Sequence, residues 1–269
     1  MVETTMNYMA PMDERPFYYL YEPPAGVDWR NSRGDRRTVA VHDARELDAA
    51  PTLDDRGFML ATHRTSVADL YDDDTIRSAY YPEMEDVVAR VTGAARVLAF
   101  DHNVRCADLA EKPDNVAQNP VRLVHNDYTA GSGPQRVRDL LPADEAEALV
   151  AHRFAVINAW KPIVGPVTVS PLAVCDARSM QPDDFVATDL RYEDRTGEIY
   201  SVAFSPGHRW FYYPAMQADE LMLLKCFDTD PKRARFTAHT AFDDPGSPAD
   251  APARESIEVR TLAFFEPEA

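Results

Sequence analysis

Short β-rich segments follow one another along most of the chain after residue 95. Segments rich in β-branched and aromatic residues occupy positions 96–105, 121–129, 153–163, 170–179, 184–192, 197–205, 208–214, 220–229, 234–242 and 255–265. Strands that succeed each other with short connections favour an antiparallel sandwich or barrel. We therefore expect a mainly β fold with flanking helices.

Two segments show a helical pattern instead. Residues 73–92 carry an apolar stripe that includes Met84 and Val87, and Gly93 follows as a helix stop. A proline at position 82 should kink or split this helix. Residues 133–152 predict a second helical stretch, inserted between β-rich segments.

The first part of the chain differs from the rest. Residues 1–70 read as loops with short apolar pieces. We expect residues 1–95 to form a helical and loop region that packs on the core and forms part of the substrate pocket or a lid. Residues 96–269 would form the core, and the two regions together one integrated domain.

Composition excludes several classes of function. The formal net charge of the 269 residues is −17, which opposes binding to nucleic acid or to an anionic membrane. We find no run of about 18 apolar residues and no signal peptide. The three cysteines are far apart and lack CxxC spacing, as expected of reduced thiols in the cytoplasm.

One motif stands out at the end of an apolar stretch, VRLVHNDYTA at 121–130. His125 and Asp127 are two positions apart, so an extended strand places both side chains on one face. The pair could be part of a metal site, an acid–base pair or a polar strand end in contact with solvent. H-x-D alone is a weak signal, because it occurs by chance in many proteins.

Residues far along the chain strengthen the metal interpretation. His239 lies in another β-rich apolar segment, and two imidazoles with one carboxylate form the ligand set of non-haem Fe(II) oxygenases. Fifteen positions later, Arg254 and Ser256 share a strand face. A guanidinium beside a hydroxyl is well suited to binding a carboxylate in bidentate fashion.

In this order on a β-rich chain, the motifs resemble those of Fe(II)/2-oxoglutarate-dependent dioxygenases. The segments VHNDYT, RFAVINAWKP, SPLAVCDARS, RWFYYPAMQADELMLLKCFD, ARFTAHTAF and RESIEVRTLAFF are similar to the hydroxylase/desaturase family of natural-product pathways (CmcJ/AsaB-like). The resemblance covers roughly residues 95–265. It implies a double-stranded β-helix (jelly roll, cupin-like).

The resemblance also implies roles for particular residues. His125, Asp127 and His239 would bind Fe(II), and Arg254 with Ser256 would hold the C5 carboxylate of 2-oxoglutarate. The expected activity is hydroxylation or desaturation of a small secondary metabolite, with 2-oxoglutarate and O2 converted to succinate and CO2. A soluble oligomer of this kind is most commonly a homodimer.

Five further residues are weaker candidates. Arg260 is a second possible carboxylate anchor, although it could equally form an ion pair with Glu255 or Glu258. Asn158 and Trp160 should share a face and could contact 2-oxoglutarate or substrate, or simply pack in the core. Arg178 could meet an anionic substrate, with Asp176 as its structural alternative partner, and Tyr128 could line the pocket.

Two other functional classes remain open from the sequence. The chain could be a non-catalytic metal-binding β-sandwich that acts as the partner component of a two-protein biosynthetic system. A zinc hydrolase on the same ligands is a third reading. The guanidinium of Arg254 favours the dioxygenase, because a pure metal-binding module has no need of an anion anchor.

Overall fold

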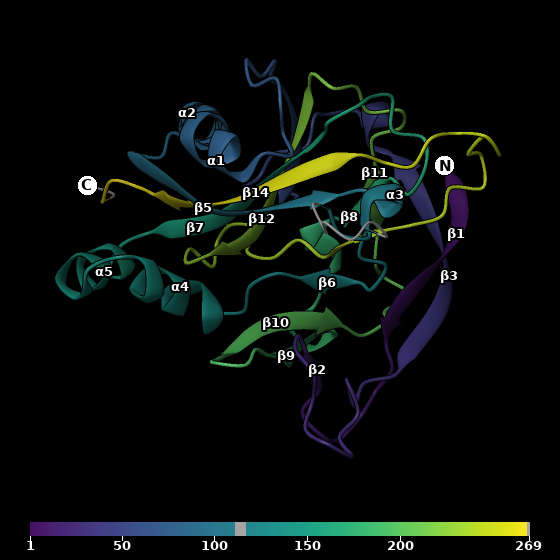
Figure 1. Ribbon diagram of the computed structural model, residues 1–269, viewed down its shortest axis with the longest axis horizontal. Coiled ribbons are helices and arrows are strands. Elements are labelled where there is room, and N and C mark those ends of the chain that lie inside the picture. The colour runs from purple at the N-terminus through teal and green to yellow at the C-terminus, as the bar shows by residue number, and fades with distance from the viewer. Residues whose placement is uncertain (111–116, 268–269) are drawn as a thin grey trace.

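Two β-sheets packed face to face form the body of the protein, seen in the computed structural model of Figure 1. The structure describes residues 1–110 and 117–267. The nine-stranded sheet has the order β1 (Val2–Met9), β3 (Gly34–Asp43), β11 (Trp210–Tyr212), β8 (Leu172–Cys175), β13 (His239–Ala241), β6 (His125–Asn126), β10 (Thr196–Val202), β9 (Phe185–Arg191), β2 (Phe17–Tyr19). The five-stranded sheet has the order β4 (Phe58–Thr62), β12 (Glu220–Asp228), β7 (Phe154–Pro162), β14 (Ser256–Phe264), β5 (Arg96–Arg105). The expected mainly β jelly roll is confirmed.

The five-stranded sheet is buried on both faces, because alternate side chains meet different partners. On β7, Ala155 and Ile157 pack outward against a cluster that includes Met84 and Val88 of the helix above the sheet. Val156 and its neighbours two positions away point into the gap between the sheets. This explains why β7 is apolar at nearly every position rather than alternating.

Helices cover the sheets on two sides. The first helical region runs through α1 (Asp73–Thr75), a π-turn (Ile76–Tyr80) and α2 (Tyr81–Thr92), and lies above β5 and β14 in Figure 1. Pro82 stands in the first turn of α2, directly after the π-turn through which the helix continues from α1. The second region, α4 (Ser132–Leu140) and α5 (Ala143–Val150), packs Val137 and Ala146 into the cluster between the sheets. Short helical turns complete the elements at α3 (Ala107–Ala110), Ala44–Glu46, Ala177–Ser179 and Pro182–Asp184.

The structure corrects the expectation that residues 1–95 are loops and helix with no part in the sheets. β1, β2 and β3 belong to the nine-stranded sheet, and β4 is an edge of the five-stranded sheet. β1 and β3 are themselves an antiparallel pair that runs from Val2↔Val41 to Met9↔Gly34. These strands carry many polar, solvent-facing side chains, which weakens the apolar signal that marks a strand in sequence.

The strands that carry the H-x-D motif and His239 are shorter than the sequence suggested. β6 has two residues and β13 has three. The amide side chain of Asn126 takes the place of ladder hydrogen bonds here. It donates to the carbonyl oxygens of Tyr128 (2.6 Å) and Cys226 (2.8 Å) and accepts from the backbone N–H of Thr237 (3.1 Å).

Candidate active site

Two histidines and one aspartate converge in the gap between the sheets. His125 and His239 lie directly opposite each other on the adjacent strands β6 and β13. Asp127 Oδ1 is 3.5 Å from His125 Nε2 and 4.0 Å from His239 Nε2. The three potential ligand atoms all lie within 4.8 Å of one another, a spacing that could hold one metal ion.

The backbone fixes which nitrogen of each imidazole faces this cluster. His125 Nδ1 is 2.7 Å from the carbonyl oxygen of Leu123, and His239 Nδ1 is 3.0 Å from that of Thr237. A carbonyl oxygen accepts only, so each Nδ1 is the protonated nitrogen. The lone pair of each neutral ring therefore lies on Nε2, as a metal ligand requires.

Two donors from the opposite sheet hold the Asp127 carboxylate. Asn158 Nδ2 on β7 donates to Oδ2 (2.7 Å), and Arg260 Nε on β14 donates to the same oxygen (2.9 Å). Oδ1 remains directed at the two imidazoles. Asp127 is thus oriented to offer one oxygen as a ligand while the other is tied to the protein.

The protonation states also suit a metal site. Burial opposes ionisation of Asp127, but the Arg260 guanidinium and the two histidines outweigh it and hold its pKa well below its usual range. Burial, assisted by repulsion from His125, lowers the pKa of His239 to about 4. Near neutral pH Asp127 is therefore a carboxylate and His239 a neutral imidazole, so neither of these two groups must lose a proton to bind a metal.

A buried guanidinium lies on the same inner face of the sandwich. Arg254 is 5% exposed, its Nη1 donates to the carbonyl oxygen of Ser170 (2.6 Å), and its guanidinium carbon is 5.4 Å from the centre of the Trp160 ring. Within the described part of the chain, Arg254 Nε and Ser256 Oγ find no hydrogen-bond partner. Burial, with repulsion from Arg105, lowers the pKa of Arg254 to about 9. A buried cation with unused donors is poised for an anion.

A narrow cavity connects this guanidinium with the histidines. Its volume is about 30 Å³, and it is lined by Arg105, Val121, His125, Trp160, Leu172, His239, Thr240, Ala241, Arg254, Glu258 and Arg260. Both histidines of the cluster and the Arg254 guanidinium therefore line the same cavity.

Comparison of this chain with known proteins identifies a family model, relatives and solved structures that it matches. A family model described as an oxidoreductase/YMDC permease-like domain matches residues 6–264. The hydroxylase/desaturase efuI of Hormonema carpetanum is 33% identical over 289 residues, covering 98% of this chain and 95% of that protein. The Fe(II)/2-oxoglutarate-dependent dioxygenase nvfI of Aspergillus novofumigatus is 33% identical over 254 residues, covering 92% and 90%. A solved structure of the iron and alpha-ketoglutarate-dependent endoperoxidase NvfI superposes with a TM-score of 0.89 at 30% identity, covering 98% of this chain and 97% of that one.

The chain belongs to the Fe(II)/2-oxoglutarate-dependent hydroxylase/desaturase family. The resemblance drawn from the sequence motifs is therefore confirmed, as are the expected enzyme class and its cofactor pair. No helix among the described residues is long and apolar enough to cross a membrane.

The residues that the sequence marked as weaker site candidates lie at different places in this dioxygenase. Asn158 and Trp160 share the inner face of β7 as expected, and Tyr128 lines a cavity beside Asp127. Arg260 ion-pairs with Asp127 and Asp101, so its position fits orientation of a metal ligand better than co-substrate binding. Arg178 lies apart from the cluster, where it pairs with Asp176 (2.8 Å) and Asp55 (3.2 Å).

One residue of the site escaped the sequence reasoning, and another, Glu258, was considered only as an ion-pair partner of Arg260, which the structure places 3.3 Å away. Asn126, the middle residue of the motif, ties β6 to β12 and to the segment before His239. Glu258 lies between Ser256 and Arg260 on the inner face of β14, where burial raises the pKa of its carboxyl. The available signal was the alternation of polar residues at 256, 258 and 260, which share one face of the otherwise apolar strand β14.

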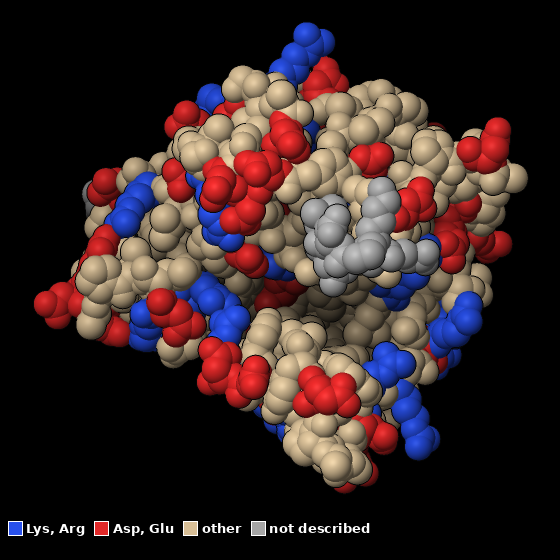
Figure 2. Space-filling model, viewed as in Figure 1, with Lys and Arg blue, Asp and Glu red and all other residues tan. Residues whose placement is uncertain are grey.

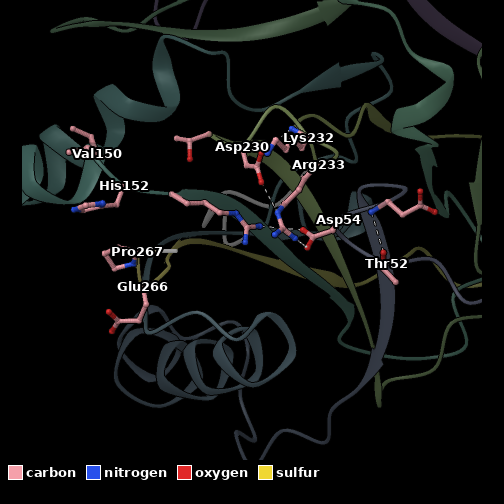
Figure 3. Close-up of a pocket in the computed structure, with 13 residues that line it drawn as sticks. Thr52, Asp54, Val150, His152, Asp230, Lys232, Arg233, Glu266 and Pro267 are labelled. Carbon is pink, nitrogen blue, oxygen red and sulfur yellow. Dashed lines mark hydrogen bonds and ion pairs between the residues drawn. The ribbon is translucent and has the colours of Figure 1, made fainter. Parts of the chain in front are cut away.

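A second, larger cavity of about 1040 Å³ lies elsewhere and carries a different kind of lining (Figure 3). Several of its charged groups pair with one another: Asp54 accepts from Arg153 and Arg233, and Asp230 accepts from Arg233. None of its lining residues belongs to the metal cluster. The ion pairs around Asp54 and Arg233 fit a structural network.

Proposed function

We propose that this oxygenase hydroxylates or desaturates a small-molecule secondary metabolite at iron bound by His125, Asp127 and His239. In this proposal Arg254 and Ser256 bind the C5 carboxylate of 2-oxoglutarate, and O2 is the second co-substrate. The relatives named hydroxylase/desaturase support the reaction class, although NvfI is itself described as an endoperoxidase.

The observation that carries the proposal is the unused hydrogen-bonding capacity next to the cluster. Arg254 Nε and Ser256 Oγ are buried without a partner among the residues described, and a buried donor left unpaired costs about 1–3 kcal/mol. A carboxylate placed there would satisfy both groups. The adjacent three-atom ligand set of two Nε2 and one Oδ1 matches the preference of non-haem iron.

The residues of the chain have separate tasks in this mechanism. Bound iron with 2-oxoglutarate supplies the oxidising chemistry of the family. Leu123 and Thr237 carbonyls keep the imidazoles in the ligating tautomer, and Arg260 keeps Asp127 ionised and oriented.

Binding of 2-oxoglutarate should also change the position and the hydrogen bonding of the Arg254 side chain. The narrow cavity offers about 30 Å³, roughly the room of one water molecule. We therefore expect the Arg254 side chain to shift from the Ser170 carbonyl and to exchange that hydrogen bond for one with the co-substrate.

An anaerobic titration tests the proposal. Fe(II) with 2-oxoglutarate should give a weak visible charge-transfer band in the wild type and none in His125→Ala or His239→Ala. Arg254→Met should weaken 2-oxoglutarate binding by roughly 10- to 100-fold while Fe(II) still binds. Arg138→Met, which removes an exposed ion pair with Glu147, is the control.

Two outcomes would decide against the dioxygenase, and a third would decide against its proposed 2-oxoglutarate anchor. A wild-type protein without the band, and without succinate release in any screen of pathway metabolites, would support a non-catalytic metal-binding component. Activity that persists without oxygen would indicate a hydrolase. An Arg254→Met variant with unchanged 2-oxoglutarate binding would remove this residue from the proposed anchor.

Three further parts of the proposal concern the pocket rim, the cellular compartment and the oligomeric state. Residues 1–95 would contribute to the pocket rim through Arg15, whose guanidinium donates to Glu198 (2.5 Å) at the edge of the cavity beside Asp127. The enzyme would work in the cytoplasm, since its three cysteines are all free and buried. Light scattering during size-exclusion chromatography would test the expected homodimer.

A further inference from the structure

The side of the metal cluster away from Arg254 opens into a cavity of about 940 Å³. Asp127 and Arg260 form its inner end, and α4, the β9–β10 hairpin and Phe100 of β5 form its walls. Figure 2 shows the molecule hollowed between the part that carries β5 and β14 and the part that carries β9 and β10. Its size suits a drug-sized metabolite. That the substrate enters here rests on the function proposed above.

The carboxylates in this cavity already have donors from the protein. Asp101 and Asp127 both accept from Arg260. Glu198 accepts from Arg15 and from the hydroxyl of Thr129.

The carboxylate of Asp139, on the α4 wall, accepts from Gln135 Nε2 (2.8 Å). The acidic lining is therefore engaged within the protein, so these groups have little free capacity to recognise a cationic substrate.

The guanidinium of Arg136, in contrast, has donors to spare. Its Nε is buried and has no hydrogen-bond partner among the described residues, and its Nη1 is 4.0 Å from Asp139, beyond hydrogen-bond reach. The side chain is 26% exposed and lies over the Phe100 ring, 5.9 Å from its centre. It thus combines a cation with an aromatic surface inside the same cavity.

We propose that Arg136 is a specificity-determining residue that binds an anionic oxygen of the substrate, a carboxylate or an ionised enol. Phe100, Tyr128, Leu190 and Ile199 supply the apolar surface for the rest of that molecule. The anion would lie against the α4 wall while the apolar body extends toward Asp127. A fork of N–H donors at a partly buried site favours an anion over a neutral amide of the same shape.

Matched pairs of ligands test this on the anaerobic Fe(II)·2-oxoglutarate protein. Calorimetry would compare 2-naphthoate and biphenyl-4-carboxylate with the corresponding primary amides. The wild type should bind each carboxylate at least about tenfold more tightly than its amide. Arg136→Gln should lose that preference, and Arg136→Lys should retain part of it. Arg138→Gln, on the same helix but in an exposed pair with Glu147, should behave as the wild type.

The charge-transfer band separates the two proposals. A retained band in Arg136→Gln shows that the iron and 2-oxoglutarate sites are intact and that the probes have not displaced the co-substrate. A wild type that lacks the band would contradict the proposed function. A wild type that has the band yet does not prefer the carboxylates, including one that binds neither probe, would overturn the role of Arg136. So would an unchanged preference in Arg136→Gln.

Discussion

At the scale of single residues, the two oxygens of Asp127 have different tasks. Oδ2 is held by Asn158 and Arg260, whereas Oδ1 faces His125 and His239. The residues that orient a metal ligand are often nearly as important for metal affinity as the ligand itself. Arg260 is well placed for this because it supplies both the hydrogen bond and the compensating charge for a buried carboxylate.

Replacing Arg260 should therefore weaken metal binding without removing a ligand. We expect Arg260→Met to lower the affinity for Fe(II) by about 10- to 100-fold, since Asp127 loses a donor and its charge compensation. Anaerobic Fe(II) titration with circular dichroism as a check on folding would measure this. Arg138→Met is the control, and equal affinities in the two variants would contradict the assigned role.

At the scale of elements, close packing of α4 determines where the wall of the large cavity lies. Gly133, in the first turn of α4, stands against Phe227, so that an added Cβ would lie 2.8 Å from the Phe227 ring. At Gly131, just before the helix, the nearest atom to an added Cβ is 3.4 Å away, an ordinary contact. Both residues are glycines, but only at position 133 does close packing require the absence of a side chain.

Alanine substitutions at Gly133 and Gly131 form a matched pair of variants that tests this difference in packing. Gly133→Ala should lower the free energy of unfolding by about 1–3 kcal/mol, because the methyl group overpacks the contact with Phe227. Gly131→Ala should change it by about 0.5 kcal/mol or less. Urea unfolding at neutral pH would measure both. Equal effects would show that α4 can shift freely from the sheet.

At the scale of the whole molecule, the site joins the two sheets. The proposed iron ligands come from the nine-stranded sheet and the loop after β6, whereas Asn158, Ser256 and Arg260 come from the five-stranded sheet. A ligand bound at this junction binds the folded state and not the unfolded chain. Its binding free energy therefore adds to stability.

Mn(II), which is stable in air, should report this coupling. With 2-oxoglutarate it should raise the melting temperature of the wild type progressively, and a free concentration of 100 times Kd corresponds to about 2.7 kcal/mol. Differential scanning calorimetry would follow the shift. His239→Ala should lose most of it, and an equal shift in that variant would place the metal elsewhere.

The strand pattern of the sequence by itself determined a mainly β sandwich or barrel, whereas the jelly roll and the ligand set of His125, Asp127 and His239 followed from the family resemblance of the motifs. The i, i+2 spacings of His125 with Asp127 and of Arg254 with Ser256 predicted shared strand faces, but Asp127 lies just after β6 and Arg254 lies two positions before β14, so neither pair falls within one strand. The sequence did not predict the sheet roles of residues 1–95, whose strands carry many polar positions. Nor could it predict that Asn158 and Arg260 meet Asp127, or that Arg136 is left with unused donors. Such partnerships depend on which strands and helices become neighbours, and tertiary packing alone decides that across separations of 31 residues for Asn158 and 133 for Arg260.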